Sequence, residues 1–174
     1  RFGAGDCGET PNLHCALLDT GKYPVIVAVC NLPGKPDGKE PPPSPGPGSG
    51  YIVHCEGGRF EGQRGQAAAF DADGKMIREF RGDSGAGHQQ NFVDAVRSGK
   101  ATAANAPVEM GHQSTEWCNL ANVAYRAAGT GAAAEQLARE LNVVDDASSL
   151  VEQMREVARA HGASEGDFRI GPVL

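Results

Sequence analysis

The sequence predicts an α+β fold in which a predominantly antiparallel sheet is covered on one face by helices. Between residues 12 and 80, short apolar segments alternate with turn residues, a pattern typical of strands. Beyond residue 85, apolar residues recur at helical spacing. Because the strands come first and the helices follow, one helical layer on an antiparallel sheet is favoured over alternating βαβ units. The 174 residues are enough for one ordinary core, so we predict a single domain over residues 1–174.

The first two strands are expected at residues 12–19 and 24–32. The residues Asp19-Thr20-Gly21-Lys22 between them have the turn chemistry of a hairpin. The second segment, Val25-Ile26-Val27-Ala28-Val29-Cys30, is apolar at both odd and even positions. This pattern predicts a central strand that is covered on both faces.

Residues 33–50 hold most of the prolines of the chain, interspersed with glycines. Proline fixes φ and removes a hydrogen-bond donor, so the segment is expected to be a long surface loop. A plain connector is favoured, and a polyproline segment that binds a partner is the alternative.

Four further strands are expected near residues 51–56, 58–61, 66–71 and 75–80. Asp73-Gly74 is a two-residue hairpin signal between the last two of them. The alternation of apolar and polar residues from Lys75 to Phe80 is imperfect, a pattern compatible with one solvated face of this strand.

The helical region begins with a short helix whose face would be formed by Phe92, Ala95 and Val96. Asp83 or Ser84 could cap its start, and Gly99 lies just past its end. Three further helices are expected. The first covers 109–128, with Trp117, Leu120, Ala121 and Ala124 on one face. The second lies around Leu137, Ala138 and Leu141, and the third, capped by Asp145 or Asp146, lies around Leu150, Met154, Val157 and Ala158.

Charge and apolar patterning argue against two classes of partner. The formal net charge is −6 and the basic residues are scattered, which disfavours a nucleic-acid-binding surface. The longest apolar run, residues 25–30, is far shorter than the roughly 18 residues that span a bilayer. We therefore expect a cytoplasmic protein without membrane or nucleic-acid partners.

The five cysteines are odd in number and form no Cys-x-x-Cys pair, which favours reduced, structural thiols. Two His-Cys dipeptides occur, His14-Cys15 and His54-Cys55. Adjacent strand residues point to opposite faces, so neither dipeptide is expected to hold a metal. Cys15, Cys55 and Cys118 are instead predicted to be buried as small hydrophobes.

Several stretches in a fixed order carry a family resemblance. They are 6–12 (DCGETPN), 31–33 (NLP), 50–51, 70–75 (FDADGK), 87–100 (GHQQNFVDAVRSGK), 105–107 and 111–126. Over roughly residues 5 to 128 the chain resembles the C-terminal half of the glucose–fructose oxidoreductase and inositol dehydrogenase-like (Gfo/Idh/MocA) family.

The resemblance implies the C-terminal domain of an oxidoreductase that uses NAD or NADP on a sugar or cyclitol. The glycine-rich turn that binds the pyrophosphate of such cofactors is missing from this sequence, as are the family's upstream lysine and histidine. The chain is thus expected to be a fragment that lacks the Rossmann domain, binds no cofactor by itself and is inactive alone. It would line a substrate cleft and form a homo-oligomer through its sheet. The alternative is a stand-alone binding or assembly module.

Two histidines are the candidate substrate-binding residues. His88 lies at the expected start of a helix, from which it could reach a substrate, although a capping or packing histidine is the commoner case. His112 lies at the start of the longest helix and shares a face with Glu116. This pair could serve acid–base chemistry, or it could be only an interaction between two surface side chains. A third hypothesis is a hydrolase that uses Cys118 with His112. It is disfavoured because no basic residue is obviously placed to lower the pKa of the thiol.

Overall fold

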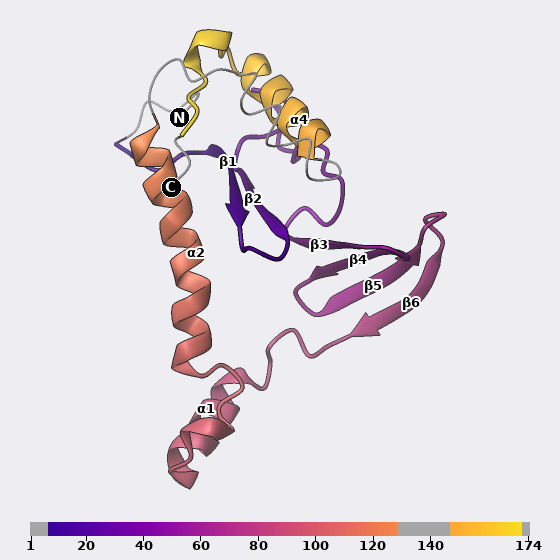
Figure 1. The fold of residues 1–174 in the computed structure, drawn as a ribbon, viewed down its shortest axis with the longest axis vertical. Helices are drawn as coiled ribbons and strands as arrows, with labels where there is room; N and C mark the ends of the chain where they lie inside the picture. The colour runs from indigo at the N-terminus through magenta and orange to yellow at the C-terminus, as the bar shows by residue number, and fades with distance from the viewer. Residues whose placement is uncertain (1–6, 129–146, 172–174) are drawn as a thin grey trace. The chain divides into compact units, whose positions relative to one another are not determined.

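The computed structural model describes residues 7–128 and 147–171, and the chain divides into two compact units (Figure 1). One unit comprises Arg1–Pro45 and Glu116–Leu174, and the other comprises Gly46–Thr115. The boundary after Pro45 falls inside the proline-rich segment. Antiparallel strands and helices occur together, so the predicted α+β class is confirmed.

The first unit contains a two-stranded antiparallel hairpin of β1 (Leu13–Asp19) and β2 (Pro24–Cys30). Its turn is organised locally: Gly21 adopts φ +74° and its N–H donates to the carboxylate of Asp19 at 2.8 Å. The predicted hairpin is confirmed, but the prediction of a central strand is wrong. Among the described residues, β2 pairs with β1 alone. Its apolar pattern reflects a hairpin that is half-buried on both sides.

Two helices complete the described part of this unit. They are the end of α2 (Val108–Ala127) and all of α4 (Ala147–Ala160), which packs on β1. A short turn η2 (Glu165–Asp167) follows α4. Most of the fully buried apolar side chains of the chain belong here, and they are Ala16, Leu32, Ala121, Ala147, Met154, Val157 and Ala158. The predicted helices at 109–128 and around Leu150 are confirmed. The helix expected around Leu137, Ala138 and Leu141, and the caps Asp145 and Asp146, lie outside the described residues.

The second unit contains a four-stranded antiparallel sheet, whose strands follow one another in chain order (Figure 1). They are β3 (Gly50–Cys55), β4 (Gly58–Gln63), β5 (Gln66–Asp71) and β6 (Met76–Arg81). All four predicted strands are thus confirmed. The strands of the chain nevertheless form two separate sheets, and β6 is exposed along its whole length. Packing of helices on the small hairpin, as of α4 on β1, is therefore found in the described residues in place of a helical layer over a single sheet.

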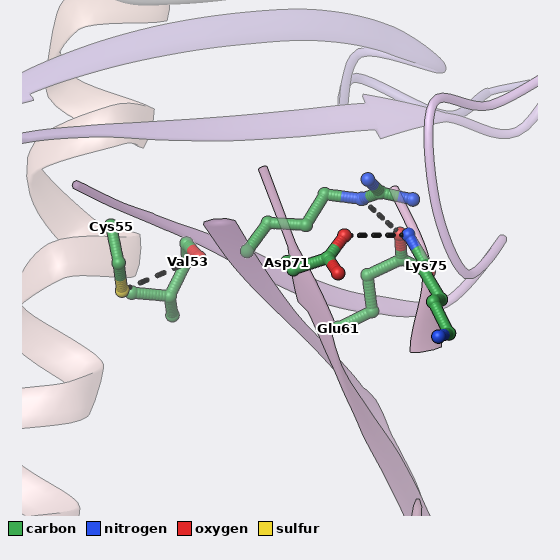
Figure 2. A network of polar contacts seen from close by, with 6 residues as sticks. Val53, Cys55, Glu61, Asp71 and Lys75 are labelled. Carbon is green, nitrogen blue, oxygen red and sulfur yellow. Dashed lines mark hydrogen bonds and ion pairs between the residues drawn. The ribbon is translucent and has the colours of Figure 1, made fainter. Parts of the chain in front are cut away.

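The turn between β5 and β6 is longer than the two residues expected. It spans residues 72–75, and the register shifts between Ala69 and Phe70. The carboxylate of Asp71 accepts a hydrogen bond from the N–H group of Asp73 at 3.1 Å. It accepts a second from the N–H group of Lys75 at 2.8 Å (Figure 2). Because one side chain satisfies two backbone donors, the turn can widen without leaving them unbonded.

The helix α1 (His88–Ser98) confirms the short helix, and its end matches the prediction. Gly99 adopts φ +63° and its N–H donates to Val96 O, as a left-handed C-cap does. Its start differs, because the N-cap is Gly87 and no side chain caps the helix. Asp83 instead accepts hydrogen bonds from the N–H groups of Gly85 and Gly87, which lowers the pKa of its carboxyl.

Only part of the expected apolar face of α1 is covered. Ala95 is buried, whereas Phe92 is 63% and Val96 64% exposed. The helix packs on the short turn η1 (Ala101–Ala103), where Asn91 donates to Ala103 O and accepts from Asn105 N. Contact with η1 therefore buries one edge of the helix and leaves Phe92 and Val96 outside.

Between β2 and β3, residues 31–49 form neither helix nor strand, and most of them are exposed. The predicted surface loop is confirmed. Two backbone hydrogen bonds shape its first half, from Gly34 N to Glu40 O and from Gly38 N to Lys35 O.

Candidate functional site

The four-stranded sheet has two faces of different chemistry. Strand residues alternate between faces, and the register places Tyr51 opposite Gly62, Val53 opposite Phe60, and Phe80 opposite Ala67. The same face continues through Ala69 and Arg78, which pair with each other. We call it the aromatic face, defined by Tyr51, Val53, Phe60, Gly62, Ala67, Ala69, Arg78 and Phe80.

Aromatic rings on this face form a continuous row across the sheet. The ring centroids of Tyr51 and Phe60 are 6.2 Å apart in a stacked arrangement, and those of Phe60 and Phe80 are 5.7 Å apart and tilted. The guanidinium of Arg78 lies 4.9 Å from the Phe80 ring centroid. Such pairs stabilise a row of rings beyond the area that they bury.

Small residues make room for the row. A side chain at Gly62 would overlap the ring of Tyr51, which lies directly against the glycine backbone. Ala67 and Ala69 are further small residues of this face, on the neighbouring strand β5. The aromatic face thus combines a row of rings with small residues.

Much of this apolar surface remains in contact with solvent. Tyr51 is 56%, Val53 48% and Phe80 38% exposed. Fully burying a large apolar side chain is worth about 1.5–3 kcal/mol, so a surface that covered the face would gain a substantial part of that for each residue. Contiguous exposed apolar patches of this kind mark interaction sites.

The opposite face of the sheet carries charged side chains together with Ile52, Phe70 and Met76. Arg59 Nε lies 2.6 Å from Glu61 Oε1, and the same guanidinium lies 4.5 Å from the Phe70 ring centroid. Arg81 donates to Gln66 at 2.9 Å and forms an ion pair with Glu79. The charged groups thus pair with one another on this face, where Arg59 and Glu61 are partly buried, whereas Tyr51 and Phe80 on the aromatic face are exposed.

The two predicted site histidines lie on different helices. His88 is the first residue of α1, and its N–H donates to Gly85 O at 3.1 Å. His112 lies in the second turn of α2. Both side chains are exposed, so neither has the buried surroundings that usually tune a catalytic acid or base. Their role as substrate-binding residues stays a prediction.

The cysteines differ from one another in burial. Burial raises the pKa of the Cys15 thiol to about 11, as suits a structural thiol. Cys55 and Cys118 are exposed, so the prediction that they are buried is wrong. The Cys55 sulfur lies 3.9 Å from Val53 O at the end of β3 (Figure 2). Within residues 7–128 and 147–171, no group of three or more His, Cys, Asp or Glu side chains could hold a metal ion.

Two other histidines make long-range contacts that the sequence did not predict. The ring of His14 in β1 lies 5.6 Å from that of Tyr125 in α2, and burial lowers the pKa of this histidine. His161 Nε2 lies 2.9 Å from Pro33 O. Both contacts join segments more than a hundred residues apart, so no local pattern could reveal them.

Comparisons of the chain with protein-family models, with curated proteins and with solved structures found no match. Among the helices that the structure describes, none is both long and apolar enough to cross a membrane. The fold and the aromatic face are therefore the basis for a functional proposal.

Proposed function

We propose that this chain is an assembly module, in which the aromatic face of the β3–β6 sheet pairs with the same face of a second copy. In the context of the family resemblance, the module would be the C-terminal domain of an NAD(P)-dependent oxidoreductase acting on a sugar or cyclitol. It would supply the oligomer interface and one wall of the substrate cleft. The observation that carries the assembly proposal is the row of Tyr51, Phe60 and Phe80, in which Tyr51 and Phe80 are exposed and Phe60 is half-buried.

A second copy is the occupant that the chemistry of the sheet favours. The unit Gly46–Thr115 carries almost equal numbers of acidic and basic residues, so two copies repel each other little. A two-fold interface requires one surface to complement itself. The aromatic face meets this requirement, because the exposed rings of Tyr51 and Phe80 can pack against the same rings of a copy turned by a half-rotation.

This proposed interface uses a different sheet from the one expected from the sequence. That expectation assumed that Val25–Cys30 is a strand of a large sheet with one exposed apolar face. In the structure this strand belongs to the small hairpin, whose other strand packs on α4. The four-stranded sheet provides the exposed apolar surface instead. The proposal of a homo-oligomer through a sheet face therefore stands on different residues.

The catalytic part of the proposal rests on the resemblance alone. The sequence contains no strand–turn–helix with the glycine spacing that binds a dinucleotide pyrophosphate. We therefore propose that NAD or NADP is bound by another part of the full-length protein and that this chain alone is inactive. His88 and His112 are the residues through which it would contact a sugar-like substrate.

Light scattering coupled to size exclusion tests the assembly proposal. The chain should show a dimer mass that increases with concentration, and Val53→Lys and Phe80→Lys should each shift it to monomer. Gln63→Lys is the matched control, because Gln63 is an exposed residue on the opposite face of the same sheet. A chain that stays monomeric over the whole concentration series would disprove the proposal, as would a dimer that both aromatic-face variants leave intact.

A further inference from the structure

The surface loop contains a segment whose backbone is restricted at every residue. Residues 39–45 read Lys-Glu-Pro-Pro-Pro-Ser-Pro. From Glu40 to Pro45, each residue is a proline or directly precedes one. Proline holds φ near −65°, and a residue before proline is driven to extended conformations. The segment therefore favours the polyproline II helix before any partner binds.

The fold presents this segment at the surface. Lys39, Pro41, Pro43 and Pro45 are exposed and Pro42 is half-buried. The start of the segment is anchored by the hydrogen bond from Gly34 N to Glu40 O at 2.9 Å. Gly34 also lies close to the backbone of the segment, since a Cβ there would be 3.4 Å from Pro42 Cα. One end of the segment is thus held while most of its rings face outward.

The spacing of three residues suits one edge of such a helix. A polyproline II helix has 3 residues per turn, so in that conformation Lys39, Pro42 and Pro45 would follow one another along a single edge, and Pro41 and Ser44 would lie along the next. This arrangement gives two X-Pro pairs, Pro41-Pro42 and Ser44-Pro45, with one cation ahead of them. Grooves that read polyproline helices accept such pairs between aromatic side chains.

We propose that residues 39–45 are a docking segment for a protein domain of the SH3 type. The two X-Pro pairs would lie in its aromatic-lined slots, and Lys39 would pair with a carboxylate at the end of the groove. The restricted backbone reduces the ordering entropy that binding costs, which makes a short segment sufficient. The segment shares no residue with the aromatic face, so the two proposals can fail independently.

Calorimetric titration of the whole chain tests the inference. The probe is an isolated SH3 domain that prefers a basic residue three positions before the first proline of Pro-x-x-Pro. We expect saturable one-to-one binding, weakened at least about tenfold, or 1.4 kcal/mol, by the Pro42→Ala/Pro45→Ala double variant. Lys39→Ala should weaken binding by several-fold and make it less sensitive to salt.

Two variants in the same loop serve as controls. Pro36→Ala and Lys35→Ala remove a proline and a cation that lie outside the three-residue spacing, and they should leave the affinity unchanged. A synthetic peptide of residues 37–47 provides a second measurement that does not depend on folding. Absence of saturable binding by the chain overturns the inference, and so does a peptide that binds when the chain does not. Equal losses in the control variants would overturn it as well.

Discussion

The imidazole of His161 is hydrogen-bonded to the carbonyl oxygen of Pro33, with 2.9 Å between Nε2 and O. A carbonyl oxygen can only accept, so Nε2 carries the proton. His161 directly follows α4, and its backbone N–H donates to Val157 O and Ala158 O. One residue therefore both ends the helix and ties it to the first residue of the proline-rich loop.

Replacing His161 with alanine should destabilise the first unit. The lost hydrogen bond is half-buried, so we expect the free energy of unfolding to fall by about 1 kcal/mol, measured by urea denaturation. His161→Gln, which keeps an N–H donor, should recover part of the loss. His88→Ala is the matched control, because that side chain is exposed at the start of α1. An equal loss in His88→Ala would contradict the assignment.

His14 should make the stability of the protein depend on pH. Burial lowers the pKa of this histidine below 6.5, so the unfolded chain takes up the proton more readily than the folded chain does. Its contribution is therefore fully present above pH 6.5 and is lost as the pH falls below that value. Unfolding free energies measured at pH 7.5 and pH 5.5 should differ more in the wild-type chain than in His14→Gln.

Every ionisable group other than His14 is common to both proteins, so the comparison isolates His14. A His14→Gln variant with the same pH dependence as the wild type would show that the burial of this histidine has no energetic consequence.

Local patterns predicted the elements well, because local chemistry decides them. Gly99 ends α1 as expected, since it adopts φ +63° and satisfies a carbonyl of the last turn. The strands around Asp73-Gly74 were also found, although the turn is wider than two residues. Its width depends on the Asp71 carboxylate, which bonds N–H groups two and four residues ahead. A dipeptide signal does not contain that information.

Burial and sheet membership could not be predicted in the same way, because they depend on contacts between distant segments. The uniformly apolar Val25–Cys30 suits a central strand and also a half-buried hairpin strand, and the structure has the second. Phe92 and Val96 share a helix face with Ala95, but only Ala95 is covered. For the same reason, the sequence did not reveal that Tyr51, Phe60 and Phe80, from three strands, form one row.

Asp71 should be a stability determinant of the four-stranded sheet. Its side chain accepts two backbone hydrogen bonds in the turn before β6, so Asp71→Ala leaves both donors to water. We expect a loss of about 1–2 kcal/mol in the free energy of unfolding, and Asp71→Asn should restore part of it. Asp73→Ala, which changes an exposed carboxylate in the same turn, is the control. A loss in Asp73→Ala as large as that in Asp71→Ala would contradict this role.

The thiols should differ in their rates of alkylation under native conditions. Only the thiolate reacts, and burial holds the pKa of Cys15 at about 11, so this thiol should react last with iodoacetamide at pH 8. Cys55 and Cys118 are exposed and should react first and at similar rates. Mass spectrometry of the digested protein gives the rate for each residue, and labelling in denaturant gives the reference. Labelling of Cys15 as fast as Cys55 would contradict the assigned burial, whereas labelling of Cys118 far faster than Cys55 would favour the thiol-hydrolase hypothesis over the assembly module.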